Sequence, residues 1–582
     1  MPRILKFGGF ELLPATYELR RGSRPVKVER LAMELLLLLV SRHDRVVSRE
    51  EIAERLWGKN IYVDTENGVN TAIRKVRRAL ADNPEQPRFI KCMPGKGYRF
   101  IAPVVEEQDG KLSPTKRIRL AVLPFSNYAG DPSEDYFCDG MSEETIAALG
   151  TVSPQNLGVI ARTSAMTYRN TTKSVSVIGK ELHVDYVLEG SIRREGNRVR
   201  IAVQLIRVDD QTHVWAANYN RDDAGILSLQ AELGRAIAEQ VVEKIPGGIA
   251  PRKQTDNPDA FDFYLRGRFY FAQRSRAGVL RAIEFYNHAL ALDSSYSLAN
   301  AGLADAYATL PINSDYPTSD CRAIGLPAAQ RAIAQDSHSA EAHTAVAACY
   351  FWLTWDWTAA IDAARRAIGL NPSYSLAHFY LAHTFSNLCR HDDAEAEMKI
   401  VHELDPYSVF YHAIHGQLLY QAGRHADAAA MAHSAITLNP SSWLGHHILG
   451  KVLIESGDLD AALTELQQAF ELSGGSSEAL ALKAFALARK GCLDQAKESV
   501  KLLHEAARTR YMPPYSLALA YVGLGDDEAA FSWLQRAADQ EDVRLRFVPV
   551  DSRWRELNRD ERVRRLWPPP QRHLQHGTRS RP

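Results

Sequence analysis

The sequence has few cysteines, no long apolar run and no net charge. Its six cysteines lie far apart and form no CxxC pair, which excludes a disulfide-rich secreted scaffold and suits a reducing compartment. The longest apolar run, Leu31–Val40, has ten residues including Glu34, against about 20 needed to cross a bilayer. The opening MPRILKFGGF is too short and too interrupted for a signal-peptide core. We therefore expect a cytoplasmic protein whose cysteines are small buried hydrophobic residues.

Composition and length indicate a folded chain of several domains. Hydrophobic residues make up 45% of the sequence and charged residues 24%, which is ordinary for globular proteins and excludes wholesale disorder. The 582 residues exceed the roughly 250–300 at which a single core stops growing.

Positive charge is concentrated near the start of the chain. Residues 1–105 hold 20 Lys and Arg against 12 Asp and Glu, a balance of +8, so the remainder carries −8. A basic segment attracts polyanions, because neutralising phosphates releases condensed counterions. A solvated helix face is the alternative explanation for such a run, so charge alone does not decide between the two.

The most basic stretch predicts an amphipathic helix over Gly68–Leu80. Apolar residues recur there at i, i+4, i+7 and i+11, one stripe of a helix with 3.6 residues per turn. They are Val69, Ile73, Val76 and Leu80. The stripe leaves four cations on the other faces: Arg74, Lys75, Arg77 and Arg78.

Two helices are expected before this one and a hairpin after it. Val28–Val40 reads as a mostly buried helix, and Ser48 followed by Glu51 is a capping box that opens a second helix. Arg88–Val104 alternates apolar and polar residues around a tip at Gly95–Gly97, the signal for a hairpin. Three helices followed by a hairpin form a winged helix.

Residues 1–105 resemble the OmpR/PhoB-type winged helix-turn-helix family. The matching pieces are a strand region at Leu5–Val28, the phrase VVSREEIAERLWG, the helix VNTAIRKVRRAL and the wing PGKGYRF. The resemblance implies a DNA-binding domain whose helix Gly68–Leu80 enters the major groove. A purely structural winged helix is the alternative.

The resemblance also implies roles for individual residues. Arg74 and Lys75 are expected at base edges, since the fork of an arginine meets O6 and N7 of guanine together. Thr71 is expected near them, at the helix start. Phosphate or backbone contacts are expected from Arg77, Arg78, Trp57, Lys96 and Tyr98. The family wing usually reads Thr-Val-Arg-Gly-x-Gly-Tyr, but Pro94 replaces its minor-groove arginine, which leaves Lys96 as a partial replacement.

A polar linker is expected at 106–117 and a second domain at 118–246. Arg119–Phe125 reads as a buried strand, while Val184–Arg194 and Asn197–Val208 predict a hairpin. Strands mixed with helices indicate a small α/β domain. Phrases such as VDYVLEGSIRR and VQLIRVDDQTHVWAANYNRD resemble the TolB-amino-terminal-like domain, which also accompanies some class III adenylate cyclases.

We find no cyclase catalytic domain in the sequence, so we expect no enzyme activity and no cofactor. Four carboxylates in the second domain leave a metal site open as an alternative: Asp131, Glu134, Asp135 and Asp139. Solvated or helix-N-terminal acidic residues are the interpretation that we favour for such a cluster.

The later part of the chain repeats every 34 residues. Asn371, Asp405, Asn439 and Ser473 follow one another at that spacing in similar phrases, and 34 residues is the period of the tetratricopeptide repeat. About seven units are expected over 263–544. They predict an all-α solenoid whose concave face binds peptide segments or protein partners.

The first helix of each repeat usually lines the groove, and seven residues on such helices are candidate partner contacts. They are Phe379, His383, Phe410, Gln417, Tyr420, His447 and Lys451. The alternative is that some belong to the core between repeats. Metal binding needs ligands that converge on one point, and we expect no metal site from the histidines of the repeats. Residues 545–582 are expected to form a C-terminal tail, disordered over its last part, RLWPPPQRHLQHGTRSRP.

The order of domains resembles that of HilA-like bacterial transcription regulators. It implies a sequence-specific DNA-binding regulator whose partners are double-stranded promoter DNA and a protein or peptide in the repeat groove, with RNA polymerase as a candidate. We expect no phospho-acceptor receiver domain before the winged helix, so an activating signal is expected to enter through the middle domain or the repeats. A repeat scaffold and a cyclase-related enzyme are the alternatives.

Overall fold

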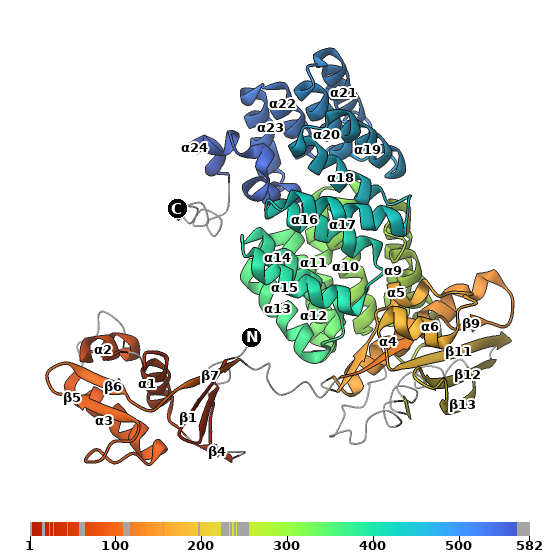
Figure 1. The fold of residues 1–582 in the computed structure, drawn as a ribbon. Coiled ribbons are helices and arrows are strands. Elements are labelled where there is room, and N and C mark those ends of the chain that lie inside the picture. Colours follow the sequence, from red (N-terminus) through yellow and green to blue (C-terminus); the bar gives the residue numbers. More distant parts are fainter. Residues whose placement is uncertain are drawn as a thin grey trace. The chain divides into compact units, whose positions relative to one another are not determined.

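The chain divides into two compact units, Met1–Lys116 and Arg117–Pro582. The computed structural model describes residues 3–13, 18–21, 24–26, 28–43, 45–57, 65–108, 117–154, 156–195, 198–222, 232, 236–237, 240 and 255–566. Figure 1 shows the elements coloured along the sequence.

The first unit combines a winged helix with an antiparallel sheet. Its helices and hairpin confirm the predicted ones: α1 (Arg30–Ser41), α2 (Arg49–Trp57), α3 (Thr65–Leu80), β5 (Ile90–Met93) and β6 (Gly97–Phe100). The sheet has the order β4-β3-β2-β1-β7. Its strands are β1 (Arg3–Phe7), β2 (Phe10–Leu13), β3 (Glu18–Arg21), β4 (Arg24–Val26) and β7 (Val105–Gln108). Because β7 pairs with β1, residues 106–108 belong to the sheet, and the prediction that the linker begins at 106 is wrong.

Aromatic side chains fix the hairpin to the sheet of the first unit. The ring of Phe7 lies 4.9 Å from that of Phe100 and 5.9 Å from that of Phe89. Phe10 lies 5.6 Å from Phe89, and all four rings are buried. Edge-to-face pairs of this kind contribute about 0.5–1.5 kcal/mol beyond the burial of their area.

The second unit begins with a mixed sheet of order β10-β8-β11-β12-β13, with β9 paired to β11. Its strands are β8 (Ile118–Val122), β9 (Ser126–Asn127), β10 (Leu157–Val159), β11 (Tyr186–Glu195), β12 (Arg198–Arg207) and β13 (His213–Asp222). Among the described residues of this domain, the helices are α4 (Asp135–Val152), α5 (Arg162–Met166) and α6 (Val175–Leu182). The predicted α/β class and the hairpin β11–β12 are confirmed. Residues 223–231 and 241–246 of the predicted domain lie outside the described residues.

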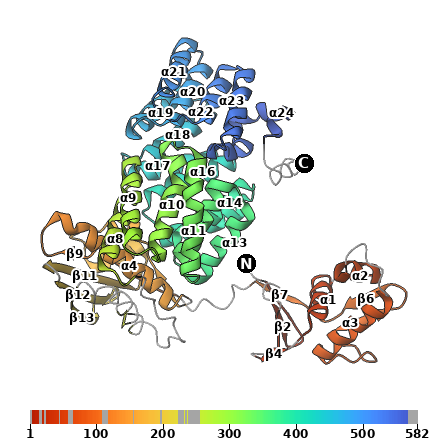
Figure 2. The same cartoon turned by 180° about the vertical axis from the view of Figure 1, so that it is seen from behind.

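Eight antiparallel helix pairs follow, one more than the estimate of about seven, and they begin at Pro258 rather than Phe263. Figures 1 and 2 show them stacked as a solenoid, with α4 of the sheet domain beside α8. The pairs are α8 (Pro258–Phe271) with α9 (Arg276–Leu292), α10 (Ser297–Ser314) with α11 (Thr318–Gln335), α12 (Ala340–Cys349) with α13 (Trp357–Leu370), α14 (Ser375–Asn387) with α15 (His391–Leu404), α16 (Val409–Gln421) with α17 (His425–Leu438), α18 (Trp443–Ser456) with α19 (Leu459–Leu472), α20 (Ser477–Arg489) with α21 (Leu493–Ala506), and α22 (Pro514–Leu524) with α23 (Asp527–Asp539).

The 34-residue period follows from the turns between the pairs. Asn371 and Asn439 end α13 and α17, and their side-chain oxygens accept hydrogen bonds from the main chain two residues on, at 3.0 and 2.9 Å. After Asn439 the hydroxyl of Ser442 caps α18, whereas Tyr374 after Asn371 gives α14 no side-chain cap. At Asn439 an Asx turn followed by a serine cap therefore directs the chain from α17 into α18.

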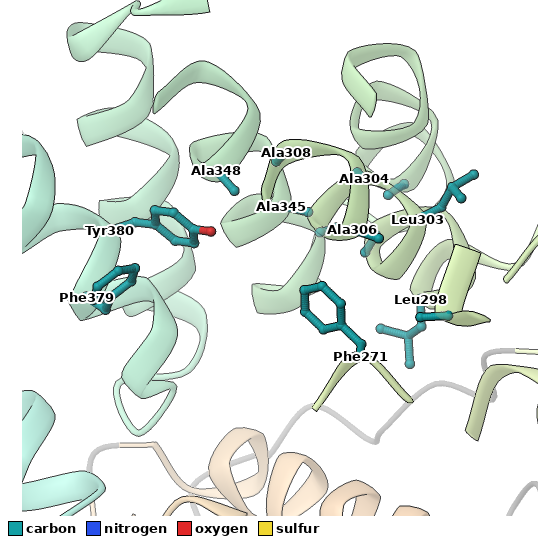
Figure 3. Packing of buried hydrophobic residues seen from close by; sticks show 14 of the residues in the cluster. Phe271, Leu298, Leu303, Ala304, Ala306, Ala308, Ala345, Ala348, Phe379 and Tyr380 are labelled. Carbon is teal, nitrogen blue, oxygen red and sulfur yellow. The ribbon is translucent and has the colours of Figure 1, made fainter. Parts of the chain in front are cut away.

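Small residues let neighbouring helices of the solenoid approach closely. Figure 3 shows alanines of α10 and α12, among them Ala304 and Ala345, where the two helices meet, with Tyr380 to the left and Phe271 below them in this view. A Cβ added at Gly267 or Gly302 would lie 2.4 and 2.6 Å from the ring of Tyr286. The repeat core therefore depends on small residues facing large ones.

The chain does not end in a tail at 545. Residues after α23 form η3 (Val543–Val550), η4 (Ser552–Trp554), η5 (Leu557–Arg559) and α24 (Glu561–Arg564). Arg546 and Trp554 are among the largest fully buried side chains, which corrects the predicted boundary. Residues 567–582, which include most of the segment predicted to be disordered, lie outside the described residues.

Two further findings concern the cysteines and the helices. All six cysteines are free, and Cys138, Cys321 and Cys349 are buried as predicted, whereas Cys92 and Cys389 are exposed. Among the helices that the structure describes, none combines the length and the apolar character needed to cross a membrane.

Candidate DNA interface and repeat interior

The outer face of α3 carries exposed polar and cationic side chains. The predicted apolar stripe of α3 is buried, as the residues Val69, Ile73, Val76 and Leu80 show. Four of the predicted DNA contacts are exposed on the other side: Thr71, Arg74, Lys75 and Arg78. A helix buried on one face and cationic on the other can lie against a phosphate-lined groove.

Lys75 is paired within the domain. Its Nζ lies 2.6 Å from Oε2 of Glu29, which precedes α1. Both side chains are largely exposed, and such surface pairs contribute about 0–1 kcal/mol. The lysine can therefore exchange Glu29 for a base edge or phosphate at little cost.

Arg77 differs from its exposed neighbours, and the prediction that it contacts phosphate is corrected. Its Nη2 donates a hydrogen bond to the main-chain oxygen of Ile90 at 2.9 Å, and its guanidinium is largely buried. Asp82 lies 4.0 Å from the Arg77 Nε and accepts hydrogen bonds from the main-chain N–H groups of Arg88, Phe89 and Ile90. Arg77 and Asp82 thus hold α3 against β5.

Tyr98 is also a structural residue rather than a surface contact. It is buried, and its hydroxyl donates to Oδ1 of Asn70 at 2.9 Å and accepts from Nη2 of Arg49 at 3.2 Å. Burial raises the pKa of Tyr98. The three residues join α2, α3 and β6. Sequence reasoning missed Arg49 and Asn70, because nothing in their spacing indicates that they share a partner on the wing.

The wing tip presents Lys96 and Pro94, both exposed. Gly97 next to them has φ of 124°, and a Cβ there would lie 2.1 Å from the main-chain oxygen of Val47. Val47 and Tyr98 exchange main-chain hydrogen bonds of 2.8 and 2.9 Å, so only glycine permits this approach. Trp57 ends α2, and its side chain lies outside the described residues.

The four carboxylates that left a metal site open each interact with other groups of the chain. Asp131 caps η1 (Pro132–Glu134), and Glu134 lies 3.3 Å from Arg194. Asp135 accepts a hydrogen bond from Asn127. Asp139 is buried and pairs with Arg162 and Arg169, so it is neither solvated nor free. Among the described residues no group of three or more His, Cys, Asp or Glu side chains is arranged to hold a metal ion.

The concave face of the repeats is covered by the chain's own segment 542–554. Arg544 in η3 donates to the main-chain oxygen of Ile312 at 3.1 Å and to Oδ1 of Asp315 at 2.7 Å. Its Nε lies 3.6 Å from Oε2 of Glu478 on α20. One buried arginine therefore connects the second helix pair with the seventh.

Arg546 lies in a cage of aromatic rings. Its guanidinium donates to the main-chain oxygens of Phe351 and Trp352, in the π-helical turn η2 (Tyr350–Thr354). It lies 4.8 and 4.7 Å from the centroids of those two rings, and 5.7 Å from those of Trp355 and Trp357. Desolvated cation–π contacts contribute about 2 kcal/mol or more, which helps offset the burial of this charge.

A third buried cluster surrounds Asp551. Its carboxylate accepts from the hydroxyl of Tyr420 at 3.2 Å, lies 3.9 Å from Nζ of Lys451 and pairs with Arg553. Lys451 also donates to Oε1 of Gln417 at 2.7 Å. Burial lowers the pKa of Lys451 to about 8.

The predicted partner contacts of the groove are therefore corrected in part. Phe379, His383, Gln417, Tyr420, His447 and Lys451 are all buried, and Phe410 is half-buried. They do lie on first helices, but the alternative reading as interior residues holds for most of them. All except Tyr420 line one cavity of about 90 Å³.

Comparison with known families agrees with this arrangement. Residues 23–100 match the family "Transcriptional regulatory protein, C terminal". Residues 116–235 match "HilA/YgeH-like transcriptional regulator, second domain", and residues 419–484 match the tetratricopeptide repeat. The chain therefore joins an OmpR/PhoB-type DNA-binding domain, a HilA-like second domain and tetratricopeptide repeats.

Individual relatives cover parts of the chain. "Putative adenylate cyclase 3" of Rhizobium meliloti is 33% identical over 277 residues, which are 47% of this chain and 46% of that protein. Transcriptional regulator HilA of Salmonella typhi is 23% identical over 295 residues, 50% of this chain and 51% of that protein. The chain thus spans about half the length of these curated relatives. The solved DNA-binding domain of Klebsiella pneumoniae RstA, in complex with the RstA box, is 25% identical, with 17% of this chain and 96% of that chain covered and a TM-score of 0.16.

Proposed function

We propose that the chain is a sequence-specific DNA-binding transcriptional regulator. The main observation that supports this proposal is the outer face of α3. Thr71, Arg74, Lys75 and Arg78 are exposed there, on a helix whose other face is buried. Arg74 and Lys75 are the residues that we assign to base edges, and Arg78 and Lys96 those for phosphates. The match of residues 23–100 to a family of transcriptional regulatory domains supports this assignment.

Genome-wide occupancy of the tagged full-length protein tests the proposal. We expect discrete sites that share one sequence pattern, and Arg74→Ala should lose them. Arg21→Ala, which removes an exposed cation of β3 rather than of α3, is the matched control and should keep them. A uniform signal along the chromosome, equal for all three proteins, would count against sequence-specific binding.

We infer that the second unit contacts a protein partner, with RNA polymerase as the candidate expected for a regulator of transcription. The tetratricopeptide repeats support a protein contact, and a regulator that contacts DNA and polymerase would act in the cytoplasm. Co-sedimentation of the full-length chain with polymerase holoenzyme tests the identity of the partner. A chain that sediments alone at micromolar concentrations would exclude polymerase.

A cyclase-related activity is the second candidate, since one relative carries that name. We propose that the chain has no such activity, because the carboxylates that could hold two metal ions are engaged with arginines and an amide. Purified chain with ATP or GTP and Mg²⁺ or Mn²⁺ should form no cyclic nucleotide. Formation of cyclic nucleotide that is abolished by Asp139→Asn would favour a cyclase-related enzyme. If the chain binds no DNA, the alternative of a repeat scaffold would be favoured.

A further inference from the structure

The solenoid contains a half-open chamber of two adjoining parts. The larger part has a volume of about 470 Å³ and lies between the α8–α9 turn, the end of α10 and the starts of α16, α18 and α20. The smaller part, of about 90 Å³, is the cavity lined by the predicted groove residues. The two parts share Arg274, Ile312, Asn313, Phe410, Trp443, Leu444 and Ser476. Ligand sites are typically concavities of about 300–1,000 Å³ with apolar walls and a few polar groups.

The inner part contains a histidine without a partner. His383 is 2% exposed, and neither of its ring nitrogens has a hydrogen-bond partner among the described residues. Burial lowers its pKa to about 3, so the ring is neutral and can both donate and accept. Leaving such a buried group unpaired costs about 1–3 kcal/mol. A buried polar group without a partner is rare in folded proteins, and the imidazole of His383 is such a group on the wall of the chamber.

Aromatic rings form the walls around this histidine. His383 lies 5.4 Å from Phe379 and stacks on Phe547 of the covering segment at 6.1 Å, ring centroid to centroid. Phe410 lies 5.2 Å from Phe379, and Trp443 lines both parts of the chamber. A planar apolar molecule can pack against aromatic rings that line a cavity in this way.

The outer part is electropositive. Three arginines line it, and two of them bond to main-chain oxygens: Arg276 to Ser314 and Arg510 to Gly475. The third, Arg274, stacks on Phe410 at 4.4 Å, and no hydrogen bond or ion pair to its guanidinium is found among the described residues. The one carboxylate of the wall, Asp315, is engaged by Arg544.

Helix ends add to this potential. The starts of α9, α16, α18 and α20 line the outer part. The hydroxyl of each capping serine accepts a hydrogen bond from a main-chain N–H of its own helix. A helix start carries roughly half a positive charge. Arg274 and these ends together leave a site for one negative charge at the entrance to the aromatic part.

We propose that this chamber binds a small organic anion, with an aromatic body against Phe410 and Trp443, a polar group at His383 and a carboxylate at Arg274. The site deepens the proposed function by naming the ligand class that the second unit senses. Binding itself does not depend on that function, whereas an effect of the ligand on DNA occupancy rests on it.

The test uses full-length protein and two naphthalene probes of similar size. 1-Naphthoate supplies an aromatic body with a carboxylate, and 1-naphthylmethylammonium supplies the same body with a cation. Titration calorimetry should give micromolar binding of one naphthoate per chain and at least tenfold weaker binding of the cation. Equal binding of the two probes, or no binding of naphthoate at millimolar concentration, would overturn the proposal.

Variants locate the site. Arg274→Gln should weaken naphthoate binding at least tenfold, and His383→Leu should weaken it while keeping an apolar wall. Arg281→Gln is the matched control, because Arg281 also stacks on aromatic rings but lies outside the chamber and pairs with Glu284. Its affinity should equal that of the wild type. Arg274→Gln with wild-type affinity would contradict the proposed site.

A variant whose larger side chain fills the chamber provides a second, independent test. Asn313 lines both parts, and Asn313→Phe should block naphthoate without removing a buried contact. If Arg274→Gln fails to fold, as judged by circular dichroism, this variant still decides the matter: unchanged binding refutes the chamber site. Operator affinity measured on the same samples separates the two proposals, since loss of DNA binding with intact naphthoate binding contradicts only the proposed function.

Discussion

Arg544 in η3 donates a hydrogen bond of 2.7 Å to Asp315 in the turn after α10, although 229 positions separate them along the chain. Arg546 makes the corresponding contact to η2, and Asp551 to Lys451 on α18. The segment after the last helix pair therefore lies in the interior of the solenoid and connects helix pairs that are distant in sequence.

Removing this connection should destabilise the second unit. Arg544→Met leaves Asp315 and Asp542 buried without their cation, and breaking a buried ion pair costs about 3–5 kcal/mol. Arg562→Met in α24 removes an exposed arginine that pairs with Glu528 and Asp560, and should cost at most ~1 kcal/mol. Urea unfolding followed by tryptophan fluorescence measures both. Equal effects of the two variants would show that segment 542–554 is not a structural part of the solenoid.

Gly97→Ala should damage the wing. The added Cβ meets the Val47 main-chain oxygen at 2.1 Å, and the φ of 124° is unfavourable for alanine. Gly95→Ala is the control, because Gly95 also has a positive φ, of 70°, but no atom within 4 Å of an added Cβ. We expect the control to cost about 1–2 kcal/mol and Gly97→Ala clearly more. Thermal unfolding of residues 1–116 measures the difference, and similar losses would argue against the close approach.

Arg77 and Arg78 should respond differently to truncation. Arg77→Ala removes the bond to Ile90 and should lower the stability of residues 1–116 by about 1–2 kcal/mol. Arg78→Ala should leave stability unchanged but make the slope of log affinity against log salt shallower by about 0.9. A stable Arg77→Ala whose salt slope alone changes would restore this residue as a phosphate contact.

Asp305 should make the second unit less stable as pH rises. It is buried in α10, and burial raises its pKa to about 7 from an ordinary value of 3.8. Between these values the folded chain keeps a proton that the unfolded chain releases, so raising pH favours unfolding by at most about 1.4 kcal/mol per pH unit. Asp305→Asn should remove this contribution and gain stability relative to wild type between pH 5 and pH 7.5. A constant difference between the two proteins over this range would contradict the raised pKa.

Local patterns in the sequence were sufficient to predict most of the fold. The apolar stripe of α3, the Ser48 cap, whose hydroxyl accepts from the Glu51 N–H at 3.1 Å, and the 34-residue period each depend on residues close in sequence. In a full capping box the Glu51 carboxylate would accept from the main-chain N–H of Ser48. Here that carboxylate pairs with Arg45 instead.

Contacts between distant residues could not be predicted in the same way. Segment 542–554 has neither a repeat pattern nor a long apolar run, and its arginines and aspartates are typical of an exposed tail. Their burial depends on partners such as Asp315 and Lys451, which lie far away in the sequence. Arg77 and Tyr98 were assigned to the DNA surface by resemblance, whereas their partners Ile90 and Asn70 place them inside the domain.

The central claim is that α3 reads DNA sequence, and competition binding of residues 1–116 tests it most directly. Affinity for a selected operator and for a scrambled duplex is measured between 50 and 200 mM salt, with wild type and Arg74→Ala. We predict a steep fall with salt for both duplexes, a preference for the operator, and a loss of about 1–3 kcal/mol of discrimination at particular base pairs in Arg74→Ala. Binding that is independent of salt, or equal for the operator and the scrambled duplex, would contradict the account.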